Sequence, residues 1–116
     1  MGSEMCIRDR GLGLETMRKG FVYLMASKRN GTIYLGVTSD LPRRVREHKT
    51  NHDPKSFTAL HSVHTLVWFE DYDLIVEAIQ REKTMKKYLR QWKINLIEEA
   101  NPDWRDMDPV TGEFID

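Results

Sequence analysis

The chain has 116 residues, of which 40% are hydrophobic and 31% charged, and this length suits one small domain rather than two separate cores. Its single cysteine, Cys6, excludes a disulfide framework and a cysteine zinc cluster. The net charge of zero hides an asymmetry, because residues 17–100 carry 15 Lys and Arg against 10 Asp and Glu, whereas residues 101–116 carry one Arg against five acids. A basic body fits a polyanionic partner, although a solvated surface explains it equally simply.

No apolar run approaches the roughly 18 residues needed to span a membrane, and no secretory signal pattern is present. We therefore expect a cytoplasmic protein without membrane contacts. Residues 1–16 lack hydrophobic periodicity, and Met1-Gly2-Ser3 resembles a cloning remnant. We expect residues 1–16 to be a non-native or disordered leader, residues 17–104 to form the domain, and residues 105–116 to form an acidic C-terminal tail.

The first predicted elements are two strands, Phe21–Ala26 and Thr32–Val37, both rich in β-branched and aromatic residues. Asn30-Gly31 between them predicts a type I′ hairpin turn, because both residues tolerate positive φ. A two-residue loop places Arg29 opposite Thr32, and Tyr23 and Tyr34 then share one face of the sheet. A three-residue loop would break that parity.

A helix is predicted next, capped by Ser39 or Asp40 and running through His48. Arg44 and His48 fall on its apolar stripe, together with Leu41 and Val45. Asn51 to Ser56 is predicted as loop, and a third strand follows from about Val63 to Tyr72.

From Asp73 onward, apolar residues recur at helical spacing, with a possible break near Tyr88 and a stop at Asn101-Pro102. Glu82 lies on the apolar stripe of this helix. The predicted fold is therefore α+β: a small antiparallel three-stranded sheet flanked by helices, in the order ββαβαα.

Four ionisable residues occupy positions where apolar residues are expected: Tyr23, Tyr34, Arg44 and Glu82. A carboxylate on an apolar stripe is costly unless it is paired, hydrogen-bonded or bound to a metal. Two interpretations meet that requirement. One is a buried Arg–Glu ion pair beside two core tyrosines, and the other is a catalytic site.

The ordered set of motifs resembles the GIY-YIG nuclease superfamily, most closely its small stand-alone members, which are similar to the N-terminal domain of excision-repair nucleases. The resemblance extends to Trp104, and its motifs are Val22-Tyr23-Leu24, Tyr34-Leu35-Gly36, Arg44, His48 and Arg81-Glu82-Lys83. Position 37 departs from several relatives, because it is valine where they carry a lysine or another polar residue.

The resemblance implies a metal-dependent endonuclease that hydrolyses phosphodiester bonds in DNA, or alternatively RNA, during repair or recombination. Glu82 would be the only protein ligand of Mg²⁺ or Mn²⁺. Arg44 would hold the phosphate, Tyr23 or Tyr34 would act as general base, and His48 would assist. We also expect four basic residues to contact nucleic acid, unless they are simply solvated: Arg43, Lys83, Lys86 and Lys87.

Without an additional DNA-binding domain, such a chain should recognise nucleic-acid structure rather than sequence, as a monomer or weak homodimer. An alternative function keeps the fold without turnover, as a catalytically silent module that binds nucleic acid or protein. We expect the three tryptophans, Trp68, Trp92 and Trp104, to serve packing rather than base stacking.

Overall fold

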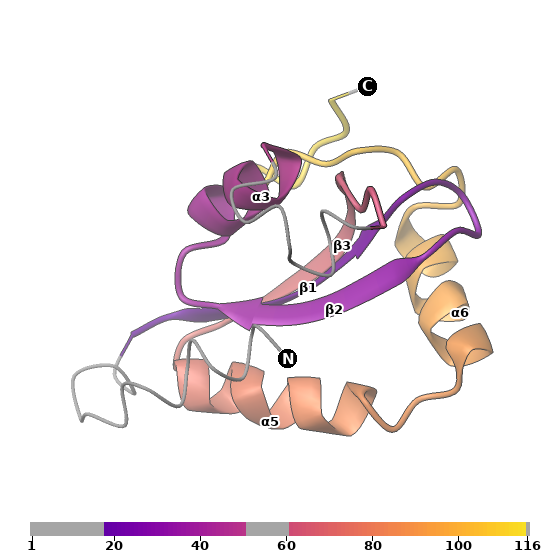
Figure 1. Cartoon of the computed structure of the whole chain (residues 1–116). Coiled ribbons are helices and arrows are strands. Elements are labelled where there is room, and N and C mark those ends of the chain that lie inside the picture. Colours follow the sequence, from indigo (N-terminus) through magenta and orange to yellow (C-terminus); the bar gives the residue numbers. More distant parts are fainter. Residues whose placement is uncertain (1–17, 51–60, 116) are drawn as a thin grey trace.

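The computed structural model describes residues 18–50 and 61–115, and its centre is one antiparallel sheet in the order β2-β1-β3 (Figure 1). The strands are β1 (Gly20–Ala26), β2 (Ile33–Thr38) and β3 (Thr65–Tyr72). The predicted leader and the predicted loop after the first helix lie outside the described residues.

Within the described residues, three helices flank the sheet: α3 (Leu41–Lys49), α5 (Ile75–Met85) and α6 (Arg90–Ala100). Helix α3 lies on one side of the sheet and α5 on the other, with α6 beside it (Figure 1). The predicted α+β fold and the order ββαβαα are confirmed. The expected break near Tyr88 separates α5 from α6. In the described part of the chain, no helix has the length and apolar character needed to cross a membrane.

The β1–β2 connection differs from the predicted two-residue turn. Ala26 pairs with Ile33, Ser27 N donates to Thr32 O at 3.0 Å, and residues 28–31 form the loop. A type I′ turn needs positive φ at both central residues, but only Asn30, at 59°, adopts it here. The predicted pairing of Arg29 with Thr32 was therefore wrong.

The observed register differs from the predicted one by an even number of residues. Tyr23 and Tyr34 therefore still lie on the same face of the sheet, as predicted. Tyr34 pairs with Met25, which shares a face with Tyr23 because side chains alternate along a strand. Tyr23 itself pairs with Gly36. Tyr23 and Tyr34 therefore lie on the same side of the sheet.

Each face of the sheet carries its own hydrophobic cluster. The cluster under α3 contains the buried residues Tyr23, Met25, Leu41, Val45, Val63 and Leu66. The cluster under α5 and α6 contains the buried residues Val22, Leu24, Ala26, Val37, Val67, Trp68, Ala78, Met85, Ile97 and Trp104. Helices α3 and α5 therefore pack on opposite faces of the sheet.

The chain after α6 is anchored to a β-bulge in β3. Leu24 pairs with Trp68 and Met25 with Leu66, so Val67 between them has no cross-strand partner. The buried Asn101 amide donates to Val67 O at 3.1 Å. Met107 N then donates to Leu66 O at 2.9 Å, which brings the acidic C-terminal segment onto β3.

The acidic segment also reaches α3. Asp106 accepts a hydrogen bond from Leu66 N at 2.9 Å and pairs with Lys49, the last residue of α3. Met107 bridges to Phe114 further along. The segment therefore packs along β3 on the side of the sheet that carries α3.

Candidate functional site

Tyr23 occupies the middle of the central strand and is fully buried. Its ring lies across Gly36 on β2, where a Cβ would stand 2.5 Å from the ring carbon Cζ and from the hydroxyl oxygen. Any larger residue at position 36 would displace the ring. Gly36 therefore makes room for Tyr23 and fixes the position of its hydroxyl group.

Three rings meet beneath α3 in what we call the tyrosine–histidine cluster: Tyr23, Tyr34 and His48. Tyr23 Oη lies 3.0 Å from His48 Nε2, and the ring centroids are 5.3 to 6.1 Å apart. Tyr23 and His48 are buried, whereas Tyr34 is only partly buried. Within the cluster, Tyr34 is therefore the ring accessible from outside.

Burial lowers the pKa of His48 from 6.5 to about 4, and the positive charge of Arg44 acts in the same direction. The imidazole is consequently neutral near pH 7. A neutral ring protonated on Nδ1 leaves Nε2 free to accept the Tyr23 hydroxyl proton in a hydrogen bond. This bond orients the phenol.

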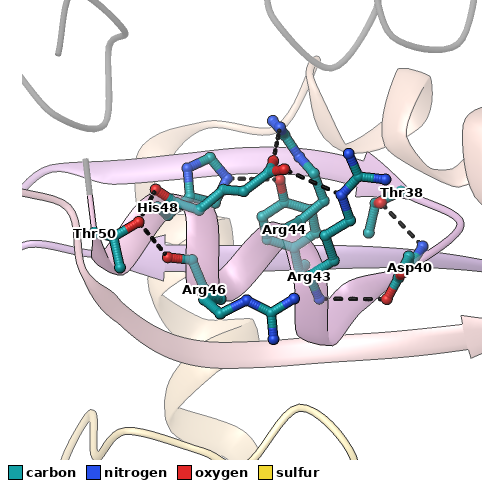
Figure 2. A network of polar contacts seen from close by, with 9 residues as sticks. Thr38, Asp40, Arg43, Arg44, Arg46, His48 and Thr50 are labelled. Carbon is teal, nitrogen blue, oxygen red and sulfur yellow. Dashed lines mark hydrogen bonds and ion pairs between the residues drawn. The ribbon is translucent and has the colours of Figure 1, made fainter. Parts of the chain in front are cut away.

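Helix α3 presents His48 and Arg44 from the same side, because they are four residues apart (Figure 2). The helix begins where the Asp40 carboxylate accepts from Arg43 N at 3.3 Å, so Asp40, one of the two predicted caps, is the cap observed. Pro42 occupies the first turn, where its missing N–H costs no hydrogen bond.

Glu47 is a site residue that the sequence analysis missed. It accepts from Arg44 Nη1 at 2.8 Å and from Arg43 Nε at 3.2 Å. Partial burial acts to raise its pKa, but the hydrogen bonds and charges of Arg44 and Arg43 hold it below the usual value. The i,i+3 and i,i+4 spacing of these residues was the available signal. Glu47 restrains the Arg44 guanidinium.

Glu82 is buried in α5, with 1% of its surface exposed. Lys86 Nζ lies 3.4 Å from its Oε2. The carboxylate thus comes from the helix that covers the face of the sheet opposite α3.

The level of Glu82 along the sheet follows from two contacts. Gly20, at the start of β1, is so close to Ile75 that a Cβ would stand 2.6 Å from Ile75 Cα. At the other end of the hairpin, Arg90 donates to the carbonyls of Asn30 and Gly31. Helix α5 therefore runs along β1 in the same direction.

The rise from Ile75 to Glu82 is about 10 Å along a helix, and the rise from Gly20 to Tyr23 is about 10 Å along a strand. Glu82 and Tyr23 are therefore about equally far, along their own elements, from the contact between Gly20 and Ile75.

A sequence model of the family described as GIY-YIG catalytic domain matches residues 19–95. The chain belongs to the GIY-YIG family. The matched range contains all three strands, helices α3 and α5, and the first half of α6. The predicted family is thus confirmed, and with it the assignment of the chain to a family of nucleases.

The chain is also similar to several UPF0213 proteins. The chain is 32% identical over 84 residues to a UPF0213 protein of Staphylococcus saprophyticus, covering 72% of this chain and all of that protein. It is 36% identical over 83 residues to a UPF0213 protein of Staphylococcus aureus, covering 72% of this chain and 99% of that one. The solution structure of a Bacillus halodurans UPF0213 protein aligns with a TM-score of 0.45 and 24% identity, over 72% of this chain and 86% of that chain.

GIY-YIG nucleases generally use a divalent metal ion, which protein side chains must bind. Within residues 18–50 and 61–115, no group of three or more His, Cys, Asp and Glu side chains could hold a metal. Glu82 offers a single carboxylate, which suits Mg²⁺ because this ion keeps several waters and takes further oxygens from phosphates. Lys86 competes for the same oxygen, but its flexible side chain is 30% exposed and can move aside.

The predicted nucleic-acid contacts divide into two groups. Arg43 is exposed on α3, beside the tyrosine–histidine cluster. Lys83 and Lys87 are exposed on the α5 side of the molecule, and Lys86 there is partly buried beside Glu82. The four residues therefore belong to opposite sides of the sheet and do not form one cluster on a single helix.

The expectation that all three tryptophans serve packing was wrong for one of them. Trp68 and Trp104 are buried, but Trp92 is 52% exposed. Helical spacing predicted that Trp92 would be buried, but on α6 only Ile97 is fully buried. Trp92 lies instead on the surface beside Tyr88, with ring centroids 5.5 Å apart.

Proposed function

We propose that this protein is a divalent-metal-dependent endonuclease that hydrolyses phosphodiester bonds in DNA, selecting DNA by structure rather than by sequence, in repair or recombination. The observation that carries the proposal is the Tyr23–His48 hydrogen bond beside Tyr34 within a GIY-YIG domain. This bond satisfies the buried Tyr23 hydroxyl and leaves the partly exposed Tyr34 as the ring of the cluster that a substrate can reach.

Phosphodiester hydrolysis needs a group that accepts the proton of the attacking water. Tyr34 is the partly exposed ring of the cluster, so we assign it the contact with that water. Tyr23 and His48 are buried behind it and hold it in position. As water attacks phosphorus, its proton passes to the oxygen of Tyr34 in its phenolate form, the bond to the leaving oxygen breaks, and the leaving oxygen takes up a proton from solvent water.

The transferred phosphate carries negative charge that grows during attack. Arg44 would bind this phosphate through its planar guanidinium, which Glu47 already holds at 2.8 Å. Glu82 would hold the metal ion. The bound ion would polarise the phosphate and stabilise the leaving oxygen.

The test is cleavage of labelled duplex, nicked, flapped, branched and single-stranded DNA with Mg²⁺, Mn²⁺ or EDTA, alongside RNA of matched sequence. Replacing Glu82 by Gln keeps the volume and removes the charge. We expect E82Q to lose at least about 100-fold in cleavage rate, because electrostatic stabilisation by one such group is worth this much.

The control is Glu77, an exposed glutamate in the first turn of the same helix. E77Q should cleave as the unchanged protein does. Cleavage that persists in EDTA, or an E82Q protein with undiminished activity, would contradict the proposal.

The silent-module alternative is favoured by one observation, the buried ion pair of Glu82 with Lys86. If that pair is only structural, no DNA is cut and E82Q lowers the melting temperature, since it removes the ion pair between the buried carboxylate and Lys86. DNA binding by both proteins without products would then identify a binding module.

A further inference from the structure

A groove of about 350 Å³ opens on the outer surface of α6, away from the tyrosine–histidine cluster. We call it the Trp92 groove, and its lining residues are Tyr88, Trp92, Asn95, Leu96 and Glu99. Apolar side chains that gather in one exposed groove, as Tyr88, Trp92 and Leu96 do here, are typical of ligand-binding sites. The groove is therefore a candidate binding site that the proposed catalytic chemistry does not use.

The aromatic wall of the groove is held in place from within. Arg81 Nη1 donates to the Tyr88 hydroxyl at 3.1 Å, and Arg81 itself pairs with Glu70 on β3 at 3.3 Å. Trp92 meets Tyr88 edge to face, at an interplanar angle of 76°. A ring fixed before binding loses little conformational entropy when a ligand stacks on it.

The segment that contributes Tyr88 and Trp92 to the groove is basic, which favours a polyanion. Residues 81–93 contain six Lys and Arg but only one acidic residue, the buried Glu82. Lys83 and Lys87 are exposed, whereas Arg90 donates to the carbonyls of the β1–β2 loop. An apolar protein partner would not require this density of cations, whereas a phosphate backbone would. Glu99, at the far end of the groove, would disfavour phosphate there and so directs the backbone toward α5.

We propose that the Trp92 groove binds an unpaired nucleobase of a DNA single strand or overhang. The base stacks on Trp92 beside Tyr88, and the adjoining backbone follows the cations of the α5–α6 segment. Stacked bases inside a duplex have no free face, so the site selects unpaired ones. Asn95 offers an amide to the edge of the base, and its Oδ1 already accepts from Gln91 Nε2 at 2.9 Å.

The groove lies near Glu82 along the chain. Tyr88 lies six positions after Glu82, so their Cα atoms are at most about 20 Å apart. A strand whose phosphate lies at Glu82 can therefore place an unpaired base a few nucleotides away at Trp92, beside Tyr88. This inference rests on the proposed function only in that the ligand is nucleic acid, and it supplies a physical basis for recognising DNA structure.

The test is binding in EDTA, which separates affinity from cleavage. A 5′-fluorescein duplex with a thymidine overhang is compared with the same blunt duplex by fluorescence anisotropy. We expect W92A to weaken overhang binding roughly 5- to 150-fold, the range that one base–aromatic stack contributes. Blunt duplex binding should not change, and W92F should lose less than W92A.

Two controls accompany W92A. Leu89 is 64% exposed and does not line the groove, so L89A should bind the overhang as the unchanged protein does. The unchanged protein should also bind an overhang of abasic sites more weakly than the normal overhang. The loss should equal the loss that W92A causes with the normal overhang. This second comparison requires no mutation and is independent of any effect of W92A on folding.

The inference is overturned if W92A binds the overhang normally, or if abasic and normal overhangs bind alike. It is also overturned if light scattering shows that the unchanged protein forms a dimer that W92A abolishes, because the groove is then a contact between two copies. Cleavage that depends on Glu82 would survive each of these results. Conversely, undiminished cleavage by E82Q would refute the proposed function and leave the overhang result standing.

Discussion

Two aromatic groups of this small domain differ in their surroundings. Beneath α3, Tyr23 is fully buried and its hydroxyl meets His48. On the α6 surface, Trp92 is 52% exposed, and its neighbour Tyr88 is held by Arg81. The comparison shows that burial fixes the geometry of the first group, so that a change there costs stability. In the second group Tyr88 still packs against the core, but Trp92 is exposed enough to be changed at little cost.

The largest effect on stability is expected from Gly36→Ala. A methyl group there would stand 2.5 Å from the Tyr23 ring, which has no room to retreat within the α3-face core. We expect the free energy of unfolding to fall by about 1 to 3 kcal/mol, the usual cost of overpacking. Urea denaturation measures this loss.

The cause of that loss can be isolated by a double-mutant cycle with Tyr23→Ala. If the clash with the ring is responsible, Gly36→Ala costs nothing further once the ring is removed. Additive losses would show that the strain has another origin and would weaken the contrast between the two aromatic groups.

A pH effect of about 2 kcal/mol is expected from His48. Its pKa is lowered to about 4 in the folded state from 6.5, so between these values the unfolded state binds more protons. The free energy of unfolding should therefore fall as the pH drops from 6.5 toward 4. Urea denaturation at pH 7 and pH 4.5 measures the fall.

His48→Asn is the reference for this experiment, because it retains the carboxylates that also titrate in this range. The variant should lose less stability on acidification than the unchanged protein. Parallel pH profiles for the two proteins would indicate that His48 is not buried in solution.

The smallest effects compare the two groups directly. Tyr23→Phe leaves the buried His48 Nε2 without this hydrogen bond and should cost about 1 to 2 kcal/mol. Trp92→Ala should change stability by no more than about 0.5 kcal/mol, as substitutions at exposed positions usually do. Thermal or urea denaturation of both variants tests the contrast, and equal losses would remove it.

Much of the fold was predictable because it depends on local patterns. The Asp40 cap, the break at Tyr88 and the burial of Glu82 follow from spacing and from helix-end chemistry. The prediction that Tyr23 and Tyr34 share a face was correct although the predicted strand register was wrong. The two registers differ by an even number of residues, which leaves every side chain on the same face.

Other features depend on contacts between distant segments. Asn101 bonds to the Val67 carbonyl at a bulge 34 residues earlier, and no spacing in the sequence marks that bulge. The exposure of Trp92 was missed for the same reason. Helical periodicity predicts which residues share one face of a helix, but it does not predict which other segment packs on that face. Glu47 is the exception, since its helical spacing to Arg43 and Arg44 was visible.

The sequence by itself therefore determined the elements, their order and the family, because each depends on local spacing and residue type. Only the tertiary structure decided that Tyr23 is buried behind Tyr34, that Glu82 approaches from the opposite face of the sheet, and that Trp92 remains exposed. These properties depend on which surfaces pack together, and packing is set by the whole chain.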